Sequence, residues 1–253
     1  MSSDSLQLTP RIRRIGRGMV NCYIVEDAGA VTIVDTGAPA YWGRLPAELA
    51  AMGRSLDDVQ SVVLTHGHSD HIGFAERIRR ERGTPIRVHE LDAALARGEV
   101  PNPSKGFGPT RIRPVLQFLL FSLRNGMLRI PPIAEVATFG DGATLDVPGA
   151  PRVVLVPGHT PGSAALLFAG HDALFVGDAL ATYAVTTGEA GPRLAPFAAD
   201  PDEALASLDR LADIDAGLVL PGHGRAWHGG VAAAVAAVRE AAAAARSPTP
   251  GSP

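Results

Sequence analysis

The stretch Thr65-His66-Gly67-His68-Ser69-Asp70-His71 carries three imidazoles and a carboxylate within six consecutive residues. Imidazole nitrogens and carboxylate oxygens are common protein ligands of zinc and similar divalent ions. So many polar, metal-binding side chains at one point would not be expected in an element that only packs into a hydrophobic core. The stretch therefore predicts a metal site.

The residues on either side of this stretch predict its local structure. The apolar run Val62-Val63-Leu64 precedes it, and residues 72–82 continue as a helix, so we predict a loop at the end of a buried strand. In such a loop the first two histidines can point to one side. The aspartate and the last histidine would then turn back toward a second point nearby, which suits two metal ions.

Composition places the chain among ordinary soluble globular proteins. Of its 253 residues, 46% are hydrophobic and 19% are charged, which predicts a single domain over residues 1–253 with a disordered tail at 247–253. The formal net charge of −3 gives no electrostatic reason to expect nucleic acid or an anionic membrane as a partner. We expect a small-molecule substrate and a monomer or homodimer.

Cysteine content and the N-terminus suggest a compartment. Cys22 is the only cysteine, so the chain has no internal disulfide and no thiolate zinc site. No apolar signal-peptide region precedes the first arginines, which makes the cytoplasm the expected location. Residues 115–123 form the longest apolar run outside the strands, and they are too few to cross a bilayer.

Alternating strand and helix patterns indicate an α/β fold. In the first half, strands are predicted at 11–16, 20–26, 30–35 and 59–65, and helices at 41–52 and 72–82. In the second half, strands are predicted at 153–156, 164–168, 173–176 and 217–220, and helices at 202–211 and 231–245. The similar arrangement of the two halves predicts two sheets packed face to face with helices outside.

A segment without strand periodicity separates the two halves. Residues 101–114 contain four prolines, and the apolar run 115–129 favours a helix as far as Asn125-Gly126. We interpret residues 98–135 as an inserted cap or lid over the site. An extra packing helix far from the site is the alternative.

Four more candidate residues follow predicted strands, as the histidine-rich loop does. Asp35, His159, Asp178 and His223 each follow an apolar, strand-like run and lie close to a glycine. Strand ends at one edge of a sheet can bring such residues together from distant parts of a chain.

With these residues in view, the chain resembles the metallo-β-lactamase-fold superfamily of hydrolases, in its glyoxalase II and lactonase-like branch. The resemblance covers Val20 to Gly224 and includes all five signature positions in order. It implies a four-layer αββα sandwich with a binuclear metal site. By this resemblance, Asp178 bridges both ions and Asp35 orients a ligand. The remaining ligands would be His66, His68 and His159 for one ion, and Asp70, His71 and His223 for the other.

The implied ligands suggest a reaction. They suit two Zn²⁺ ions, and Mn²⁺ or Fe²⁺ would also fit. A hydroxide bridging the ions would attack an ester-type carbonyl in a lactone, thioester or carboxylic ester. Asp70 is a candidate catalytic residue beside Asp178, because it could carry the proton to the leaving group.

The substrate is less well defined by the sequence. Asp178 argues against a true β-lactamase, because such enzymes lack an aspartate at the bridging position. Lactonase-type members are similar in length and carry a tyrosine close behind that aspartate, which makes Tyr183 a candidate catalytic residue; a packing role is the alternative. Phe118 and Phe121 in the predicted cap would suit an apolar acyl chain.

Two other classes of protein remain open. A persulfide-dioxygenase-like enzyme resembles this fold but uses a single iron and redox chemistry. A non-catalytic metal-binding protein is the second alternative, although the intact set of ligands argues against a catalytically inactive site.

Overall fold

Strands with alternating buried faces build the core of the protein. The computed structural model describes residues 5–106 and 108–246. In β4 (Ala30–Val34), Val31 and Ile33 pack toward the outer helices, whereas Val34 packs toward the second sheet. Because both faces of this strand are covered, its sequence is an almost unbroken apolar run.

The first sheet has seven strands arranged in the order of the sequence. The strands up to β4 pair antiparallel, and those from β4 to β7 pair parallel. Its other strands are β1 (Ser5–Thr9), β2 (Ile12–Ile15), β3 (Cys22–Asp27), β5 (Val59–Val63), β6 (Ile86–His89) and β7 (Ala137–Phe139).

The second sheet has four strands in the order β13-β10-β9-β8, and β10 and β13 run parallel. Their bounds are β8 (Arg152–Leu155), β9 (Ala164–Phe168), β10 (Ala173–Gly177) and β13 (Leu218–Pro221). A separate hairpin joins β11 (Ala181–Tyr183) to β12 (Ala190–Arg193). Tyr23, Phe168 and Phe175 pack between the two large sheets.

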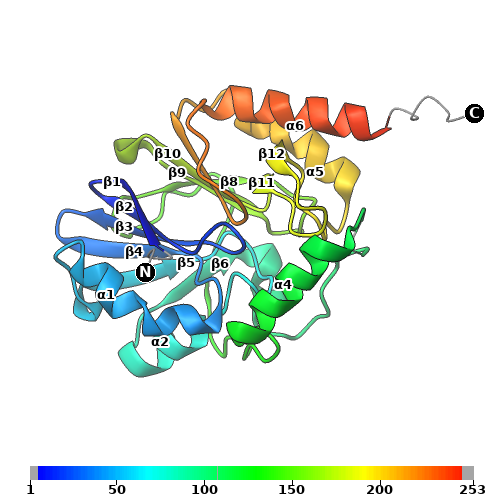
Figure 1. Cartoon of the computed structure of the whole chain (residues 1–253). Helices are drawn as coiled ribbons and strands as arrows, with labels where there is room; N and C mark the ends of the chain where they lie inside the picture. Colours follow the sequence, from blue (N-terminus) through cyan, green and yellow to red (C-terminus); the bar gives the residue numbers. More distant parts are fainter. Residues whose placement is uncertain (1–4, 107, 247–253) are drawn as a thin grey trace, which may run out of the picture.

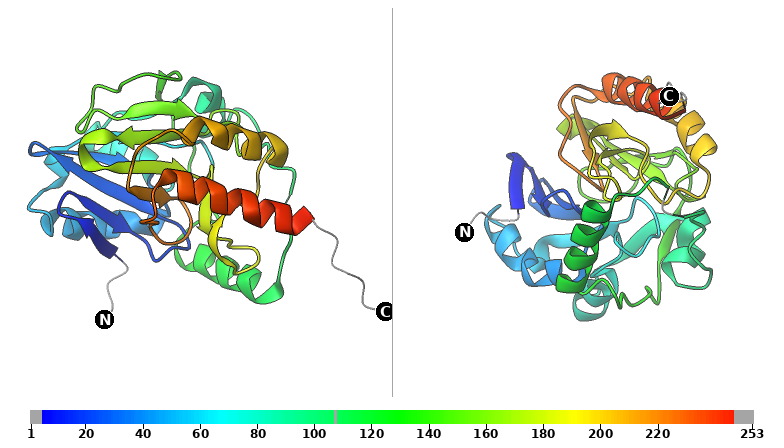
Figure 2. Two further views of the ribbon diagram at one scale, coloured as in Figure 1. Left: turned by 90° about the horizontal axis from the view of Figure 1, so that it is seen from above. Right: turned by 45° about the vertical axis from the view of Figure 1, so that its right-hand side comes forward.

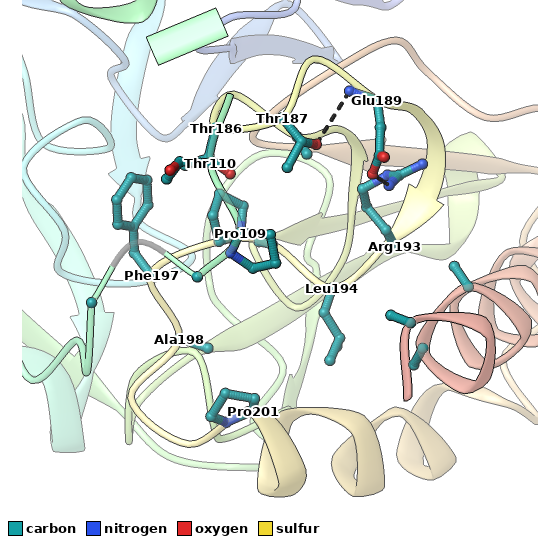
Figure 3. A pocket seen from close by; sticks show the side chains of 18 of the residues that line it. Pro109, Thr110, Thr186, Thr187, Glu189, Arg193, Leu194, Phe197, Ala198 and Pro201 are labelled. Atoms are coloured by element: carbon teal, nitrogen blue, oxygen red, sulfur yellow. Dashed lines mark hydrogen bonds and ion pairs between the residues drawn. The ribbon is translucent and has the colours of Figure 1, made fainter. Parts of the chain in front are cut away.

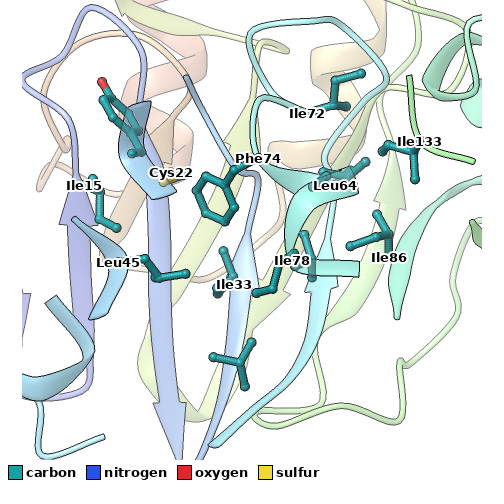
Figure 4. Packing of buried hydrophobic residues seen from close by; sticks show 14 of the residues in the cluster. Ile15, Cys22, Ile33, Leu45, Leu64, Ile72, Phe74, Ile78, Ile86 and Ile133 are labelled. Carbon is teal, nitrogen blue, oxygen red and sulfur yellow. The ribbon is translucent and has the colours of Figure 1, made fainter. Parts of the chain in front are cut away.

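Helices cover the outer face of each sheet (Figures 1 and 2). Leu45 of α1 and Ile78 of α2 pack on Ile33 of the first sheet (Figure 4). Val235 of α6 packs on Val219 of the second. The helices are α1 (Leu45–Ala50), α2 (Ala75–Arg82), α3 (Ala93–Ala96), α4 (Ile112–Arg124), α5 (Pro201–Ser207) and α6 (Val231–Arg246). The predicted αββα sandwich is confirmed.

The structure differs from the sequence predictions mainly in its short elements. β1 lies in the polar N-terminal stretch for which no strand was predicted, and β2 gives it a partner. β7 and β11 were missed because three residues are too few to show a period, and β12 was missed because it contains Gly191 and Pro192. The helix predicted at 41–52 is divided into a 3₁₀ turn at Pro39–Gly43 and α1. The predicted tail at 247–253 lies outside the described residues.

The predicted cap segment contains α4, which ends at Asn125 as the sequence indicated. Its two ends contact different halves of the fold. The N–H of Arg111 donates to the carbonyl of Thr186 (2.9 Å), and the N–H of Ala40 donates to the carbonyl of Asn125 (3.2 Å). Phe121 is partly buried and packs against the hydrophobic core of the first sheet. No helix within residues 5–106 and 108–246 is long and apolar enough to cross a membrane.

Candidate metal centre

Loops that follow five strands carry the predicted site residues. β4 leads into Asp35, β5 into the histidine-rich stretch, and β8, β10 and β13 into His159, Asp178 and His223. Within each sheet, parallel strands end at the same edge. Because the sheets face each other, these two edges lie side by side and bring distant segments together.

Hydrogen bonds hold the loops of the two sheets against each other. The N–H of Ala164 donates to the carbonyl of Thr65 (2.9 Å), and the N–H of Asn21 donates to that of Gly222 (2.9 Å). The side-chain amide of Asn21 also donates to the carbonyls of Pro221 and Gly224 (3.0 and 2.9 Å). The site therefore spans two sheets that are fixed relative to each other.

All seven predicted ligands gather at this edge. Their potential ligand atoms form three groups, in each of which the atoms lie within 4.8 Å of one another. The first and third of these groups are the two ligand sets that the family resemblance implies. The groups are His66, His68 and His159; His66, His71 and Asp178; and Asp70, His71 and His223.

Asp178 lies between the two sets. Its Oδ2 is 3.4 Å from His159 Nε2 and 3.1 Å from His223 Nε2. Its Oδ1 is 3.5 Å from His71 Nε2. The buried carboxylate therefore contacts imidazoles of both sets, which is the position a bridging ligand needs.

Asp35 orients His71 by contacting the ring nitrogen that faces away from the site. Asp35 Oδ2 lies 2.8 Å from His71 Nδ1, and Asp35 Oδ1 accepts the N–H of Thr65 (2.8 Å). A carboxylate on one ring nitrogen leaves the other nitrogen facing the site. This is the role that the family resemblance implies for Asp35. On the other side of the centre, Asn102 of the cap segment has its Oδ1 3.0 Å from His68 Nε2.

Asp92 is a site residue that the sequence analysis missed. It is fully buried after β6, and its Oδ2 accepts the N–H of Gly67 (2.8 Å) and the hydroxyl of Thr160 (2.7 Å). Its Oδ1 accepts the N–H of Gly162 (2.7 Å). One carboxylate thus joins the loop of His66 and His68 to the loop of His159. The only signal in the sequence was an aspartate in a short turn, which is common at helix starts.

We predict that Asp92→Ala destabilises the fold and separates the first set of ligands. Three buried donors would lose their acceptor, and each unpaired group costs about 1–3 kcal/mol. The free energy of unfolding should fall by roughly 3 kcal/mol or more in denaturant titrations, and metal affinity should fall with it. Asp213→Ala is a matched control, since Asp213 is exposed in the second half of the chain. Equal stability of the two variants would contradict the assignment.

Burial keeps the first set of imidazoles neutral. It lowers the pKa of His66 well below its ordinary value, lowers that of His68, and lowers that of His159 to about 3. At neutral pH each of these rings therefore has an unprotonated nitrogen. That is the form of histidine that binds metal ions.

Nearby carboxylates, rather than burial, determine the protonation of the imidazoles in the second set. Burial alone would lower the pKa of His71 and His223, but nearby carboxylates outweigh it. Asp35 and Asp178 raise the pKa of His71 well above its ordinary value, and Asp178 and Asp70 raise that of His223 to about 10. Positive charge at this point is therefore strongly favoured.

We predict that metal uptake at the second set releases protons. Below its raised pKa each ring is protonated in the metal-free protein, and it must lose that proton to bind an ion. The affinity should therefore increase with pH and level off near the pKa of His223, about 10. Calorimetric zinc titrations of metal-free protein in two buffers of different ionisation enthalpy would measure the release. Identical heats in both buffers would count against it.

The donor set fits divalent metal ions. Four buried atoms of the site have no hydrogen-bond partner among the described residues: His66 Nε2, His71 Nε2, His159 Nδ1 and Asp178 Oδ1. Buried polar atoms are normally paired, and a metal ion would satisfy several at once. Imidazole with carboxylate suits Zn²⁺, Mn²⁺ or Fe²⁺.

Tyr183 lies at the end of β11, and it lines a cavity of about 670 Å³ with residues of the first turn of α4. Its hydroxyl is 3.8 Å from the position that a Cβ on Gly188 would occupy. The side chain thus faces the β11–β12 loop. Its catalytic role stays a prediction.

Comparison with known proteins identifies the family. The profile of the Metallo-beta-lactamase superfamily matches residues 15–223, which include every residue of the candidate centre. The chain therefore belongs to the metallo-beta-lactamase superfamily. Two relatives from Bacillus subtilis are named probable metallo-hydrolases, and a metallo-hydrolase is the class that the family and the candidate metal site together suggest.

Individual relatives and solved structures share this family or its fold. The probable metallo-hydrolase YybB of Bacillus subtilis (strain 168) is 26% identical, with 81% of this chain and 80% of that protein covered. The crystal structure of the metallo-beta-lactamase family protein TTHA1429 from Thermus thermophilus has a TM-score of 0.67 at 26% identity, covering 95% of this chain and 81% of that one. The structure of TTHA1623 in a di-iron-bound form has the same fold, with a TM-score of 0.56 at 24% identity, covering 85% of this chain and 92% of that one.

Proposed function

We propose that this protein is a binuclear metallo-hydrolase that cleaves an ester-type bond in a lactone, thioester or carboxylic ester. The observation that supports this most is the position of Asp178, which contacts imidazoles of both ligand sets. Zn²⁺ is the ion we propose, with Mn²⁺ and Fe²⁺ as alternatives. When bound, two such ions lower the pKa of water and polarise a carbonyl oxygen.

The residues of the chain would then have separate tasks. His66, His68 and His159 would hold one ion, and Asp178 would fix the spacing to the second. Asp70 is only partly buried, and it lies 3.3 Å from His223 Nε2. Its carboxylate is thus accessible at the rim of the second set and could pass a proton to the leaving group.

A cavity whose wall continues into one of the ligand-carrying loops would receive the apolar part of the substrate. Its volume is about 610 Å³, and Figure 3 shows Pro109, Leu194 and Phe197 around it. Another lining residue, Ala198, precedes Ala199, whose N–H donates to the carbonyl of His159 (3.0 Å). The cavity wall is therefore continuous with a loop that carries a ligand. We propose a substrate with an apolar acyl chain.

Substrate and metal content can be tested together. Purified protein with its metals counted would be assayed against thioesters, lactones, esters and β-lactams. Two ions per chain and hydrolysis of one of the first three classes is the expected result. One iron per chain with oxygen consumption on a persulfide would support the dioxygenase alternative. Full metal occupancy with no turnover would support a binding protein.

The acyl-chain proposal predicts a change in specificity for Leu194→Gln. Adding an amide to the cavity wall should raise KM for long acyl chains about tenfold while leaving short chains nearly unchanged, because only long chains would reach it. Phe121 is a poor test residue because it packs on the core. Leu6→Gln is the control, since Leu6 is half-exposed on β1. A similar rise for all chain lengths would remove the proposal.

The expected location in the cytoplasm is also a proposal. It is supported by the single cysteine, which is buried and leaves no disulfide to form within the chain. Fractionation of the native host with an antibody to this protein would test it.

A further inference from the structure

The outer face of α4 is a stripe of large apolar side chains exposed to solvent. At about 100° per residue, its members fall within roughly a 100° arc of the helix. The face that packs on the protein, with Phe121, lies on the opposite side. The exposed fractions are 80% for Ile112, 57% for Leu116, 48% for Leu119, 46% for Leu120 and 52% for Leu123.

This stripe is not the scattered apolar exposure of an ordinary surface. Outside the cap segment, the exposed large apolar side chains of the described residues are only Leu6 and Leu91. Leu128, just beyond α4, is exposed as well at 66%. Contiguous exposed apolar surface of this kind marks a contact with a partner or a membrane.

The charged side chains of the segment that carries the stripe are all positive, and two of them, Lys105 and Arg111, pair with Asp200 and Glu189 outside it. Residues 100–134 contain five basic side chains and no aspartate or glutamate. Arg113 and Arg124 border the apolar arc at about 100° and 120° from Ile112 on a helical wheel. Arg113, Arg124 and Arg129 are exposed, and no ion pair joins them to any described residue. The chain as a whole carries −3, so this concentration of positive charge is local.

Charge complementarity decides which partner fits this face. Two copies of α4 packed on each other would bring arginines together with no acidic side chain in the segment to pair them. An anionic lipid surface offers negative headgroups to the arginines and an acyl boundary to the leucines. The helix has 13 residues, too few to span a bilayer but enough to lie on one.

We propose that α4 is an interfacial helix that docks this protein on an anionic bilayer surface, with the stripe Ile112, Leu116, Leu119, Leu120 and Leu123 in the acyl boundary. The expectation of no membrane partner came from net charge over the whole chain, and the local charge of this segment overrides it. Both ends of α4 are tied to the body of the protein, so docking needs no unfolding. The proposal does not depend on the proposed hydrolytic activity.

Docking would also orient the molecule. The cavity that Tyr183 lines includes Ile112, Arg113 and Gln117 from the first turns of α4. A bilayer in contact with the stripe would therefore lie close to this cavity.

Vesicle co-sedimentation of the full chain tests the proposal. We expect binding to vesicles of equal parts phosphatidylcholine and phosphatidylglycerol, at least tenfold weaker binding to phosphatidylcholine alone, and loss of binding at high salt. The pair Arg113→Gln and Arg124→Gln should weaken binding roughly 30-fold, since each arginine near the surface contributes about fivefold. The pair Leu116→Gln and Leu120→Gln should abolish it.

Matched controls separate docking from general effects. The pair Leu6→Gln and Arg80→Gln changes the same residue types at exposed positions away from α4 and should bind like wild type. In Leu119→Trp, the difference emission spectrum should shift to the blue on anionic vesicles. No binding of wild type at low salt, or equal binding by the Leu116 and Leu120 pair, would overturn the proposal. A dimer that these two changes convert to monomer, without vesicle binding, would make a second copy the occupant.

Discussion

Replacing Asp178 with alanine is expected to lower kcat/KM by roughly 10³-fold or more, with the fold retained. Asp178 is the one carboxylate that contacts His71, His159 and His223, and these imidazoles come from three separate loops. Without it the spacing between the two ligand sets is no longer fixed. The expected cause of the loss is a lower occupancy of the second ion.

The measurement is kcat/KM on the substrate found in the panel, together with metal content per chain. Circular dichroism should match that of wild type, because Asp178 lies in a loop after β10 rather than in a core position. His68→Ala should lose activity through the first ion instead, and Asp213→Ala should behave like wild type. Unchanged turnover in Asp178→Ala would falsify the binuclear assignment.

Gly222→Ala is expected to damage the candidate metal centre although it removes no functional group. A Cβ at this position would lie 2.4 Å from Asp178 Oδ1 and 2.5 Å from His71 Cε1. Both atoms belong to side chains fixed in the site, so the new methyl must displace them. We expect metal affinity at the second set to fall at least tenfold and kcat/KM about 100-fold, with a loss of about 1–3 kcal/mol in stability.

Gly43→Ala is the matched control for this steric prediction. A Cβ on Gly43 meets no atom within 4 Å, and neither glycine has a left-handed backbone, so conformational strain does not distinguish them. Metal titrations and steady-state kinetics on both variants would separate crowding from a general effect of glycine replacement. Normal metal affinity in Gly222→Ala would show that Asp178 and His71 can move aside without consequence.

That the candidate ligands gather at one edge was predictable because the loops that carry them follow strands that the sequence marks clearly. Apolar runs before His66, His159 and Asp178 identify buried strands, and buried strands end at a sheet edge. The position of Asp35 behind His71 also agrees with the sequence prediction. Local pattern suffices here because the loops directly continue regular elements.

The contacts of Asp92 and the exposed face of α4 could not be predicted from the local sequence pattern. Asp92 acts by accepting hydrogen bonds from Gly67, Thr160 and Gly162, two segments about 95 residues apart in the chain, and no period in the sequence records such a contact. The apolar run in the cap segment predicted a helix but not which of its faces the core would cover. Phe121 turned inward and Leu120 outward.

The sequence by itself determined the layers of the sandwich, the loops that carry the ligands and the kind of ion they suit, because strand periodicity and donor chemistry are local properties. The family resemblance implied a bridging role for Asp178, but only the tertiary structure showed that its carboxylate contacts imidazoles of both ligand sets, that Asp92 joins the loops of His66 and His159, and that a cationic apolar face is left uncovered. Those features arise where two sheets and an inserted segment pack together, and packing depends on contacts between residues far apart in the chain.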